Sequence, residues 1–443
     1  MIVRANFENI LSFDKETSIS FVAGKSDLHP NHVLRAQKRD DISILKTGII
    51  YGANASGKSN IIKAIRILKQ IALGYWPKNL IEPYKTKSPN EKPSKIELTF
   101  KYDTKYYTYG VEFTIGGIQE EWLYEVNNRS AKKVFTREKK NKEQAYTFAP
   151  SRISAKKEAF LNFLGKGTPE KKSFLSEYVN RHGESLDSIN KAYNWFYDIL
   201  QIIFPESKFQ GLTFRFEQDI NFQKDFKNFL THFNTGVVDL KRFPLKKEET
   251  NIPKEIIDDI LSDSKPGTKS FISSPSGDWY FFETTEKGVL EITKQKTIHE
   301  NNNKEQYTFN MSEESDGTLR LLDFLPMLIK LKNDNAVFLI DEIDRSLHPM
   351  MSLEILNCYL SFLSNNLNTQ LITTTHECNL LNLNLIRQDE VWFVEKNING
   401  SSHLTSLAEY KPREDIRKGY LIGRYGAIPF FASTNELNWQ KNV

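Results

Sequence analysis

The sequence is poor in cysteine and has no long apolar run. Only two cysteines, Cys358 and Cys378, occur in 443 residues, and neither belongs to a C-x-x-C pair. This argues against a cysteine-based metal site and favours a reducing compartment. No run of about 18 apolar residues is present, and the first residues lack the apolar core of a signal peptide. We therefore expect a cytoplasmic protein with no membrane segment.

The chain also lacks a strong charge of one sign. Its net charge is only +4, so any nucleic-acid interface must be argued from local clusters. The 12% content of aromatic residues argues against disorder, and a length of 443 residues favours two or three domains. We find no sustained heptad pattern, so a long coiled-coil arm is not expected.

A phosphate-binding loop is the clearest motif. The segment G-A-N-A-S-G-K-S at 52–59 matches G-x-x-x-x-G-K-[ST], the Walker A motif. An apolar strand at 47–51 precedes it, and apolar residues at helical spacing follow it, which makes a chance glycine-rich turn a poor alternative. Lys58 is expected to reach the β- and γ-phosphates of ATP, and Ser59 to bind Mg²⁺. The predicted nucleotide contacts are Gly52, Asn54, Ala55, Ser56, Gly57, Lys58, Ser59 and Asn60.

Two adjacent carboxylates follow a second apolar strand. Residues 337–340 are V-F-L-I, and Asp341 and Glu342 come directly after them. Ligands of α/β sheets bind at the carboxyl ends of the strands. We therefore predict that Asp341 binds Mg²⁺ and that Glu342 orients or deprotonates the attacking water. The alternative is an acidic helix cap.

His376 follows a third apolar strand, which we place at 370–374. It should lie at the same sheet edge, where an imidazole can hydrogen-bond the γ-phosphate or the water, although a lone histidine is more often structural. Strands that alternate with helices predict a parallel α/β sheet. The predicted domains are an N-terminal part of an ATPase head at 1–126, an insertion at 127–310 and a C-terminal part of the head at 311–443. Residues 298–306, I-H-E-N-N-N-K-E-Q, are expected to form a polar loop.

These motifs resemble a known family. The phosphate loop, the V-F-L-I-D-E strand, I-D-R-S-L-H-P at 343–349, T-T-H at 374–376 and F-E-N-I-L-S-F at 7–13 are similar to the ABC-type ATPases of the SMC, Rad50 and RecF group. E-S-D-G-T-L-R at 314–320 and G-Y-L-I-G-R-Y-G-A-I-P at 419–429 resemble more closely the AAA15 or RloA-like ATPases of abortive-infection systems. The resemblance covers about 1–125 and 310–430.

The resemblance implies an ABC-type ATPase head with a mixed sheet and central helices. Within 127–310, apolar residues at helical spacing predict a mainly helical insertion with some strands. It also implies a homodimer, or a higher oligomer, in which ATP lies between two heads. Ser315, Gly317 and Thr318 occupy the place of the signature that grips the partner's ATP, but this segment departs from L-S-G-G-Q and could simply cap a helix. Asp344 would be the acid of the D-loop. Gln119 is one candidate for the Q-loop.

Three functions are compatible with this set. One is the regulatory ATPase of an anti-phage system, which controls a separate effector such as a Toprim-type nuclease. The second is a DNA-repair or chromosome ATPase. The third, a nuclease fused to the ATPase, is disfavoured because only 67 residues follow His376. A lysine- and arginine-rich stretch at 132–157 could contact nucleic acid, but acidic residues dilute it and a solvated face is the default.

Overall fold

The computed structural model describes residues 1–85, 92–139, 146–150, 155–182, 186–207, 219–263, 265–274, 276–363, 367–412 and 415–428. The chain forms two compact units. The first comprises Met1–Pro205, Leu331–Arg345 and Ser352–Val443, and the second comprises Glu206–Lys330 and Ser346–Met351. Within the described residues, no helix is long and apolar enough to cross a membrane.

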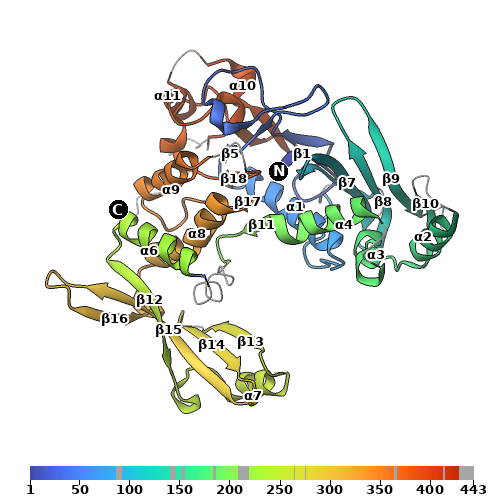
Figure 1. The fold of residues 1–443 in the computed structure, drawn as a ribbon. Coiled ribbons are helices and arrows are strands. Elements are labelled where there is room, and N and C mark those ends of the chain that lie inside the picture. Colours follow the sequence, from blue (N-terminus) through green and yellow to red (C-terminus); the bar gives the residue numbers. More distant parts are fainter. Residues whose placement is uncertain are drawn as a thin grey trace, which may run out of the picture. The chain divides into compact units, whose positions relative to one another are not determined.

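A six-stranded, mostly parallel sheet forms the centre of the first unit (Figure 1). Its order is β11-β17-β18-β5-β19-β20, and only β20 runs antiparallel to its neighbour. Its central strands are fully buried runs of apolar and threonine residues, as expected when both faces of a parallel sheet are covered. The bounds are β5 Thr47–Gly52, β11 Leu200–Ile203, β17 Val337–Ile340, β18 Gln370–Thr374, β19 Val391–Lys396 and β20 Ser402–Ser406.

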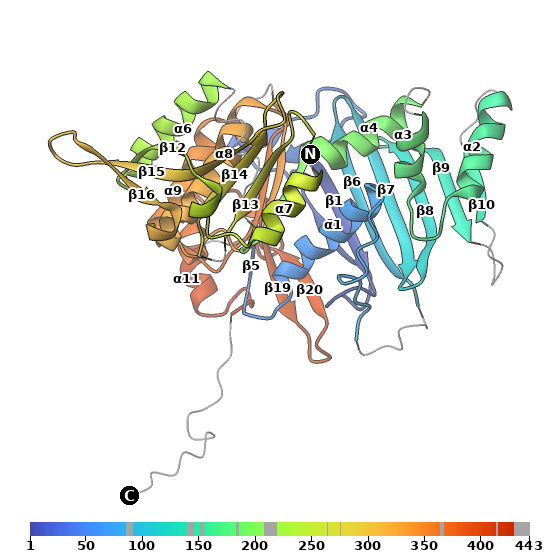
Figure 2. The same cartoon turned by 90° about the horizontal axis from the view of Figure 1, so that it is seen from below.

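A seven-stranded antiparallel sheet is the second layer of this unit, with the order β10-β9-β8-β7-β6-β1-β2 (Figure 2). Its strands are β1 Ile2–Glu8, β2 Thr17–Ser20, β6 Ser94–Tyr102, β7 Lys105–Thr114, β8 Gly117–Val126, β9 Ala131–Lys139 and β10 Tyr146–Pro150. Two short strands, β3 Val33–Leu34 and β4 Ile44–Leu45, pair separately.

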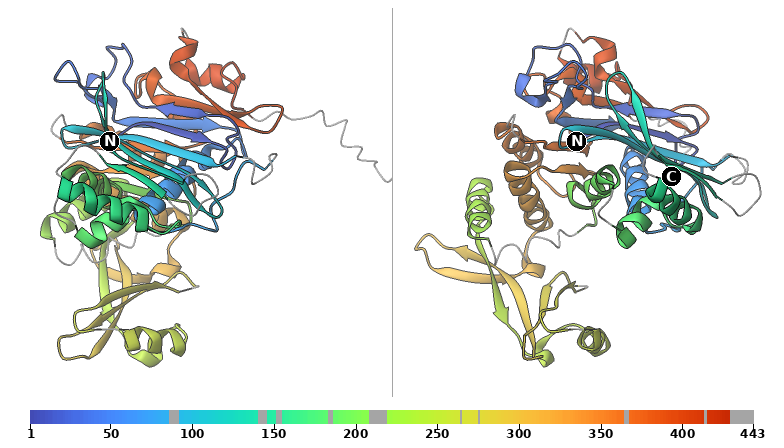
Figure 3. Two further views of the ribbon diagram at one scale, coloured as in Figure 1. Left: turned by 90° about the vertical axis from the view of Figure 1, so that its right-hand side faces the viewer. Right: turned by 45° about the vertical axis from the view of Figure 1, so that its right-hand side comes forward.

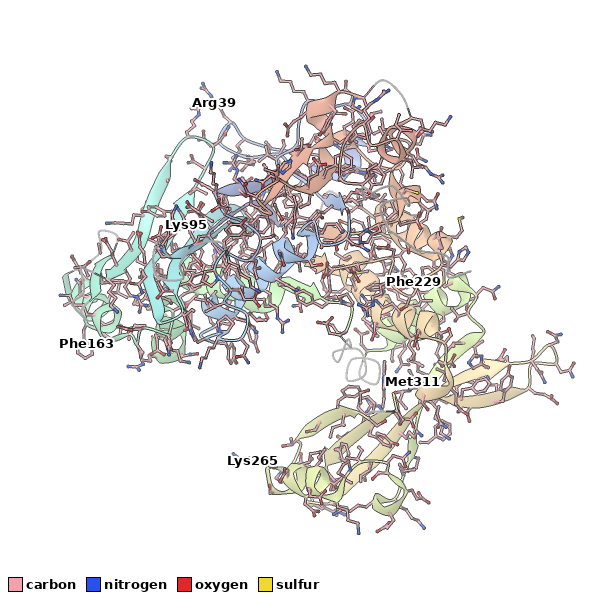
Figure 4. The ribbon with its side chains drawn as sticks, turned by 180° about the vertical axis from the view of Figure 1, so that it is seen from behind. Arg39, Lys95, Phe163, Phe229, Lys265 and Met311 are labelled. Carbon is pink, nitrogen blue, oxygen red and sulfur yellow. The ribbon has the colours of Figure 1, made fainter. Side chains whose placement is uncertain are left out.

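Helix α1 (Lys58–Ala72) contacts strands of both sheets, and its apolar side chains lie in one large core with theirs. The spacing of Ile61, Ile65, Leu68 and Ala72 gives the helix one continuous buried stripe. The other helices of this unit are α2 Ala155–Gly167, α3 Phe174–His182, α4 Asp187–Asn194, α9 Pro349–Ser361, α10 Leu407–Tyr410 and α11 Ile416–Leu421. Phe163 of α2 is an exposed apolar side chain (Figure 4).

The second unit contains a five-stranded antiparallel sheet in which β16 pairs with one end of the long strand β15 (Figure 3). Its strands are β12 Val237–Pro244, β13 Lys269–Ser273, β14 Trp279–Thr284, β15 Leu290–Glu300 and β16 Gln306–Asn310, and its helices are α6 Ile220–Phe233, α7 Lys254–Asp263 and α8 Asp316–Asn333 up to Lys330. Met311, labelled in Figure 4, is fully buried and starts the turn between β16 and α8.

The predicted α/β class is confirmed. The structure also contains the predicted strands at 337–340 (β17) and 370–374 (β18) and the predicted helix after the phosphate loop (α1). The expected polar loop at 298–306 is wrong in part, because β15 extends to Glu300 and β16 begins at Gln306, which leaves a hairpin turn. Residues 127–205, predicted as part of the insertion, pack with the first unit, since β9, β10 and β11 extend its two sheets. Strands are also more prominent in 127–310 than expected.

A buried ion pair shows why 127–205 joins the first unit. Arg137 of β9 lies 3.6 Å from Glu121 of β8, and neither side chain is exposed to solvent. The Glu121 carboxylate also accepts hydrogen bonds from the backbone N–H groups of Phe174 and Leu175, at the start of α3. Carboxylates favour helix N-termini, so this cluster anchors α3 to the sheet.

Candidate functional site

The phosphate loop lies between the end of β5 and the start of α1, as the motif requires. Two residues have left-handed backbone, Ala55 with φ 63° and Gly57 with φ 109°. Gly52 has no room for a side chain, because an added Cβ would lie 2.6 Å from the carbonyl oxygen of Val394. The turn therefore needs its glycines for conformation at one end and for close approach at the other.

The Lys58 ammonium is folded back onto this loop. Its Nζ donates to the carbonyl oxygens of Gly52, at 2.7 Å, and Ala53, at 3.1 Å. The side chain is buried, and this burial lowers the pKa of Lys58 from 10.5 to about 8, although three nearby carboxylates counteract the effect. A partly desolvated cation at a helix N-terminus is a strong attractor for phosphate.

The structure brings the two predicted metal ligands into contact. Ser59 Oγ of α1 donates to Asp341 Oδ1 at the end of β17, at 2.9 Å, although the residues are 282 positions apart in the chain. A hydroxyl and a carboxylate are hard oxygen ligands of the kind that Mg²⁺ prefers. These residues therefore fit a magnesium site beside the phosphate loop.

Glu342 stands next to Asp341 in a conformation that is unusual for a glutamate. Its φ is 53°, in the left-handed region, and its backbone N–H donates to Thr374 Oγ1 at 2.8 Å. A non-glycine residue held there costs about 1–3 kcal/mol, and such residues cluster at functional sites. Its carboxylate lies 3.5 Å from the Arg345 guanidinium and is partly exposed to solvent.

His376 and Asp344 meet at the same edge. The Asp344 carboxylate accepts from Thr375 Oγ1 at 2.8 Å and from the backbone N–H of His376 at 3.3 Å. Partial burial and the Lys58 charge lower the pKa of His376 below its usual 6.5, so the imidazole is mostly neutral at pH 7. A neutral ring can accept one hydrogen bond and donate another.

One cavity of about 530 Å³ brings together the phosphate loop, Glu342 and His376. It is lined by Asn54, Ala55, Ser56, Gly57, Lys58, Ser59, Asn60, Lys63, Glu342, His376 and Lys396. Lys63 and Lys396 were not predicted, because neither belongs to a motif. Lys396 ends β19, the strand next to β5, so the sheet order was needed to find it.

The Asn60 side chain lines this cavity and also contacts the N-terminal segment. Its Nδ2 donates to Ser12 Oγ at 2.9 Å. Ser402 Oγ donates to the carbonyl oxygen of Ser56 at 2.5 Å and lies 2.8 Å from Ser12 Oγ, from which it can accept. The segment F-E-N-I-L-S-F and the first residue of β20 are thus tied to the phosphate loop. Ser12 is therefore the residue of this N-terminal motif that makes the contact.

The expected signature lies in the second unit. Ser315 Oγ accepts from the backbone N–H of Thr318 at 3.1 Å and lies 2.9 Å from its hydroxyl, so Ser315 caps the start of α8. An added Cβ at Gly317 would lie 3.0 Å from the carbonyl oxygen of Ser346. The helix-cap alternative is therefore realised, and contact with a partner's ATP stays a prediction.

Two further candidates are placed elsewhere. Gln119 lies in the β7–β8 hairpin, where its amide donates to the carbonyl oxygen of Gly117 at 3.2 Å, so a Q-loop role gains no support. In the basic stretch, Lys132 and Lys133 of β9 are exposed, whereas Arg137 is buried. Other members of this stretch, such as Lys140 and Lys142, lie outside the described residues.

Comparisons with known proteins place the chain in a family. No curated protein matches the chain. Among solved structures, the SMC head domain from Thermotoga maritima is a distant likeness, with a TM-score of 0.37 and 16% identity over 91% of this chain and 98% of that one. The family described as "AAA domain, putative AbiEii toxin, Type IV TA system" matches residues 49–382, which begin just before the phosphate loop and end just after His376. Because this match spans well over half of the sequence, the chain belongs to that AAA-domain family.

Proposed function

We propose that this protein binds ATP with Mg²⁺ at the phosphate loop and hydrolyses it to ADP and phosphate. The observation that carries the proposal is the contact between Ser59 and Asp341 beside the buried ammonium of Lys58. A chance glycine-rich turn would not bring a helix-start hydroxyl to a strand-end carboxylate. Family membership is consistent with this activity.

Each residue then has a chemical task. Lys58 leaves the carbonyl oxygens of Gly52 and Ala53 for the β- and γ-phosphates, and the N–H groups at the start of α1 bind the same oxygens. Ser59 and Asp341 would hold Mg²⁺, which neutralises charge on the phosphates when bound. Glu342 orients the attacking water and accepts its proton, and neutral His376 hydrogen-bonds the γ-phosphate.

A second cavity, of about 430 Å³, is suited to the nucleoside. It shares Asn60, Lys63 and Lys396 with the phosphate cavity and adds apolar and aromatic side chains. Tyr84 is fixed there by a hydrogen bond from its hydroxyl to the carbonyl oxygen of Asn399 at 2.7 Å. We assign the phosphates to the first cavity and the base and ribose to this one.

The proposed working state is a homodimer of heads with ATP between them, alone or within a higher oligomer. Ser315, Gly317 and Thr318 of one protomer would face the γ-phosphate bound by its partner, and Asp344 would lie at the same interface. In support, Ser315 and Asp316 are solvent-exposed at the start of α8, where backbone N–H groups favour an anion.

We propose further that this cytoplasmic ATPase, of the AAA15 or RloA-like type, is the regulatory subunit of an abortive-infection system that controls a separate effector. The family description, with its toxin–antitoxin context, supports this class. A Toprim-type nuclease is the effector that the resemblance suggests. The second candidate is a RecF-like DNA-repair ATPase, which the exposed Lys132 and Lys133 of β9 favour.

The test is purification of the Glu342→Gln variant with the products of neighbouring genes, followed by mass measurement with and without ATP. Exposed Glu305→Gln is the matched control, since it removes the same charge at the turn of the β15–β16 hairpin, in the second unit. An ATP-dependent complex with a neighbouring protein supports the defence role. A bare dimer that gains salt-sensitive affinity for DNA supports the repair role. Full hydrolysis by Glu342→Gln refutes the assignment of Glu342.

A further inference from the structure

The acidic turn after β17 is held by one residue of the neighbouring strand. Thr374, the last residue of β18, is fully buried. Its hydroxyl donates to Asp341 Oδ1 at 2.6 Å and accepts from the backbone N–H of Glu342 at 2.8 Å. Its carbonyl oxygen accepts from the backbone N–H of Ile343 at 3.1 Å. Three consecutive residues of the turn thus bind to this single threonine.

From this geometry, and building on the proposed ATPase function, we propose that Thr374 is a positioning residue for both acids. The hydroxyl proton fixes the orientation of the Asp341 carboxylate, whose Oδ1 also accepts from Ser59. The hydroxyl lone pair holds the Glu342 backbone in its left-handed conformation, which aims its carboxylate into the phosphate cavity. One hydroxyl therefore sets the angle between the metal ligand and the residue that activates water.

The residue type suits this task. A β-branched side chain has few χ1 rotamers, so the pleat of β18 fixes where the Thr374 oxygen points. Valine has nearly the same shape but no hydroxyl, and its presence would leave the Glu342 N–H without its acceptor. Serine keeps the hydroxyl and loses only the methyl group. The neighbouring Thr375 performs a similar task for Asp344, so consecutive hydroxyls connect β18 to the loop before α9.

The strand also offers a matched control. Thr373 is also buried, and its hydroxyl proton is shared between the carbonyl oxygens of Ile340, at 3.2 Å, and Thr374, at 3.1 Å. It does not touch either acid by these bonds. Thr373→Val therefore removes a buried hydroxyl from the same strand and leaves the carboxylate of Asp341 and the N–H of Glu342 with their partners.

The experiment compares wild type, Thr374→Val, Thr374→Ser and Thr373→Val. ATP hydrolysis is measured over a range of Mg²⁺ concentrations, nucleotide binding is measured in EDTA, and hydrogen exchange is followed in the ligand-free protein over residues 336–345. For Thr374→Val we expect kcat to fall about 10–100-fold and the Mg²⁺ requirement to rise, the usual effect of losing a partner of a metal ligand. Binding in EDTA should be unchanged, and exchange over 336–345 should be faster. Thr374→Ser should resemble wild type.

Two results would overturn the proposal. One is hydrogen exchange over 336–345 that is as slow in Thr374→Val as in wild type. The other is an equal fall in kcat in Thr374→Val and Thr373→Val, which would indicate general loosening of β18. The hydrogen-exchange measurement needs no nucleotide. If wild type hydrolysed no ATP while Thr374→Val still exchanged faster, the proposed function would fail and the hold of Thr374 on the turn would stand.

Discussion

Lys58 gives the sharpest test of the site, because its burial destabilises the ligand-free protein. Its pKa falls from 10.5 to about 8 on folding, which corresponds to about 3 kcal/mol against the charged form. In Lys58→Met this penalty disappears, but two hydrogen bonds to the carbonyl oxygens of Gly52 and Ala53 are lost, at about 1 kcal/mol each. We expect the variant to be about 1 kcal/mol more stable than wild type at pH 7, without nucleotide.

The sign of the pH dependence follows from proton binding. Between about pH 8 and 10.5, the unfolded chain keeps the Lys58 proton and the folded chain releases it, so wild type gains stability as pH rises. The gain is about 1.4 kcal/mol per pH unit. The order of the two proteins should therefore reverse by about pH 9.5. Calorimetric melting temperatures at pH 7 and 9.5 measure this, with a shift of about 1–2 °C per kcal/mol for a unit of this size.

Lys58→Arg is the control, because a guanidinium keeps its charge at both pH values. Its melting temperature should fall relative to wild type as pH rises. A constant difference between wild type and Lys58→Met from pH 7 to 9.5 would refute the reasoning, since it would mean that the ammonium is solvated in the folded state.

Further predictions concern charge elsewhere in the first unit. Arg137→Met should lower the free energy of unfolding by about 3–5 kcal/mol, because it leaves the Glu121 carboxylate buried without its cation, and Arg137→Met with Glu121→Leu should recover part of this in denaturant titrations. Because the pKa of His376 lies below 6.5, His376 should contribute little pH dependence to ATPase rates between pH 7 and 8, and a rate that rises steeply there in wild type but not in His376→Gln would contradict this. Lys396→Ala should weaken nucleotide binding measurably, whereas exposed Lys304→Ala should not, as fluorescent nucleotide titration can show.

Local motifs made the phosphate loop and the acid-bearing strand predictable. A glycine-rich turn between a strand and a helix has few solutions, and an apolar run that ends in two acids places them at the sheet edge. The same reasoning could not find Lys396 or Ser12, because their position depends on which strands become neighbours. It also could not tell which of three consecutive threonines faces the acids, since that depends on the pleat and register of β18.

The errors have physical causes too. Residues 298–306 were expected to be a loop because their composition is polar, but a hairpin exposed to solvent needs no apolar alternation to form. Arg137 looked like part of a basic surface because its partner, Glu121, becomes its neighbour only through the pairing of β8 with β9. Charged residues that are buried as pairs cannot be recognised from local sequence.

The contact between Ser12 and Ser402 has a consequence for how the protein is made. These residues are 390 positions apart, and together they brace the phosphate loop. During synthesis, the loop is complete once residue 59 has left the ribosome, yet its support arrives only with the last strands of the sheet. A nascent or truncated chain that ends before β20 therefore carries the nucleotide motif without the brace, so a ribosome-bound fragment should be unable to act as an ATPase ahead of the finished protein.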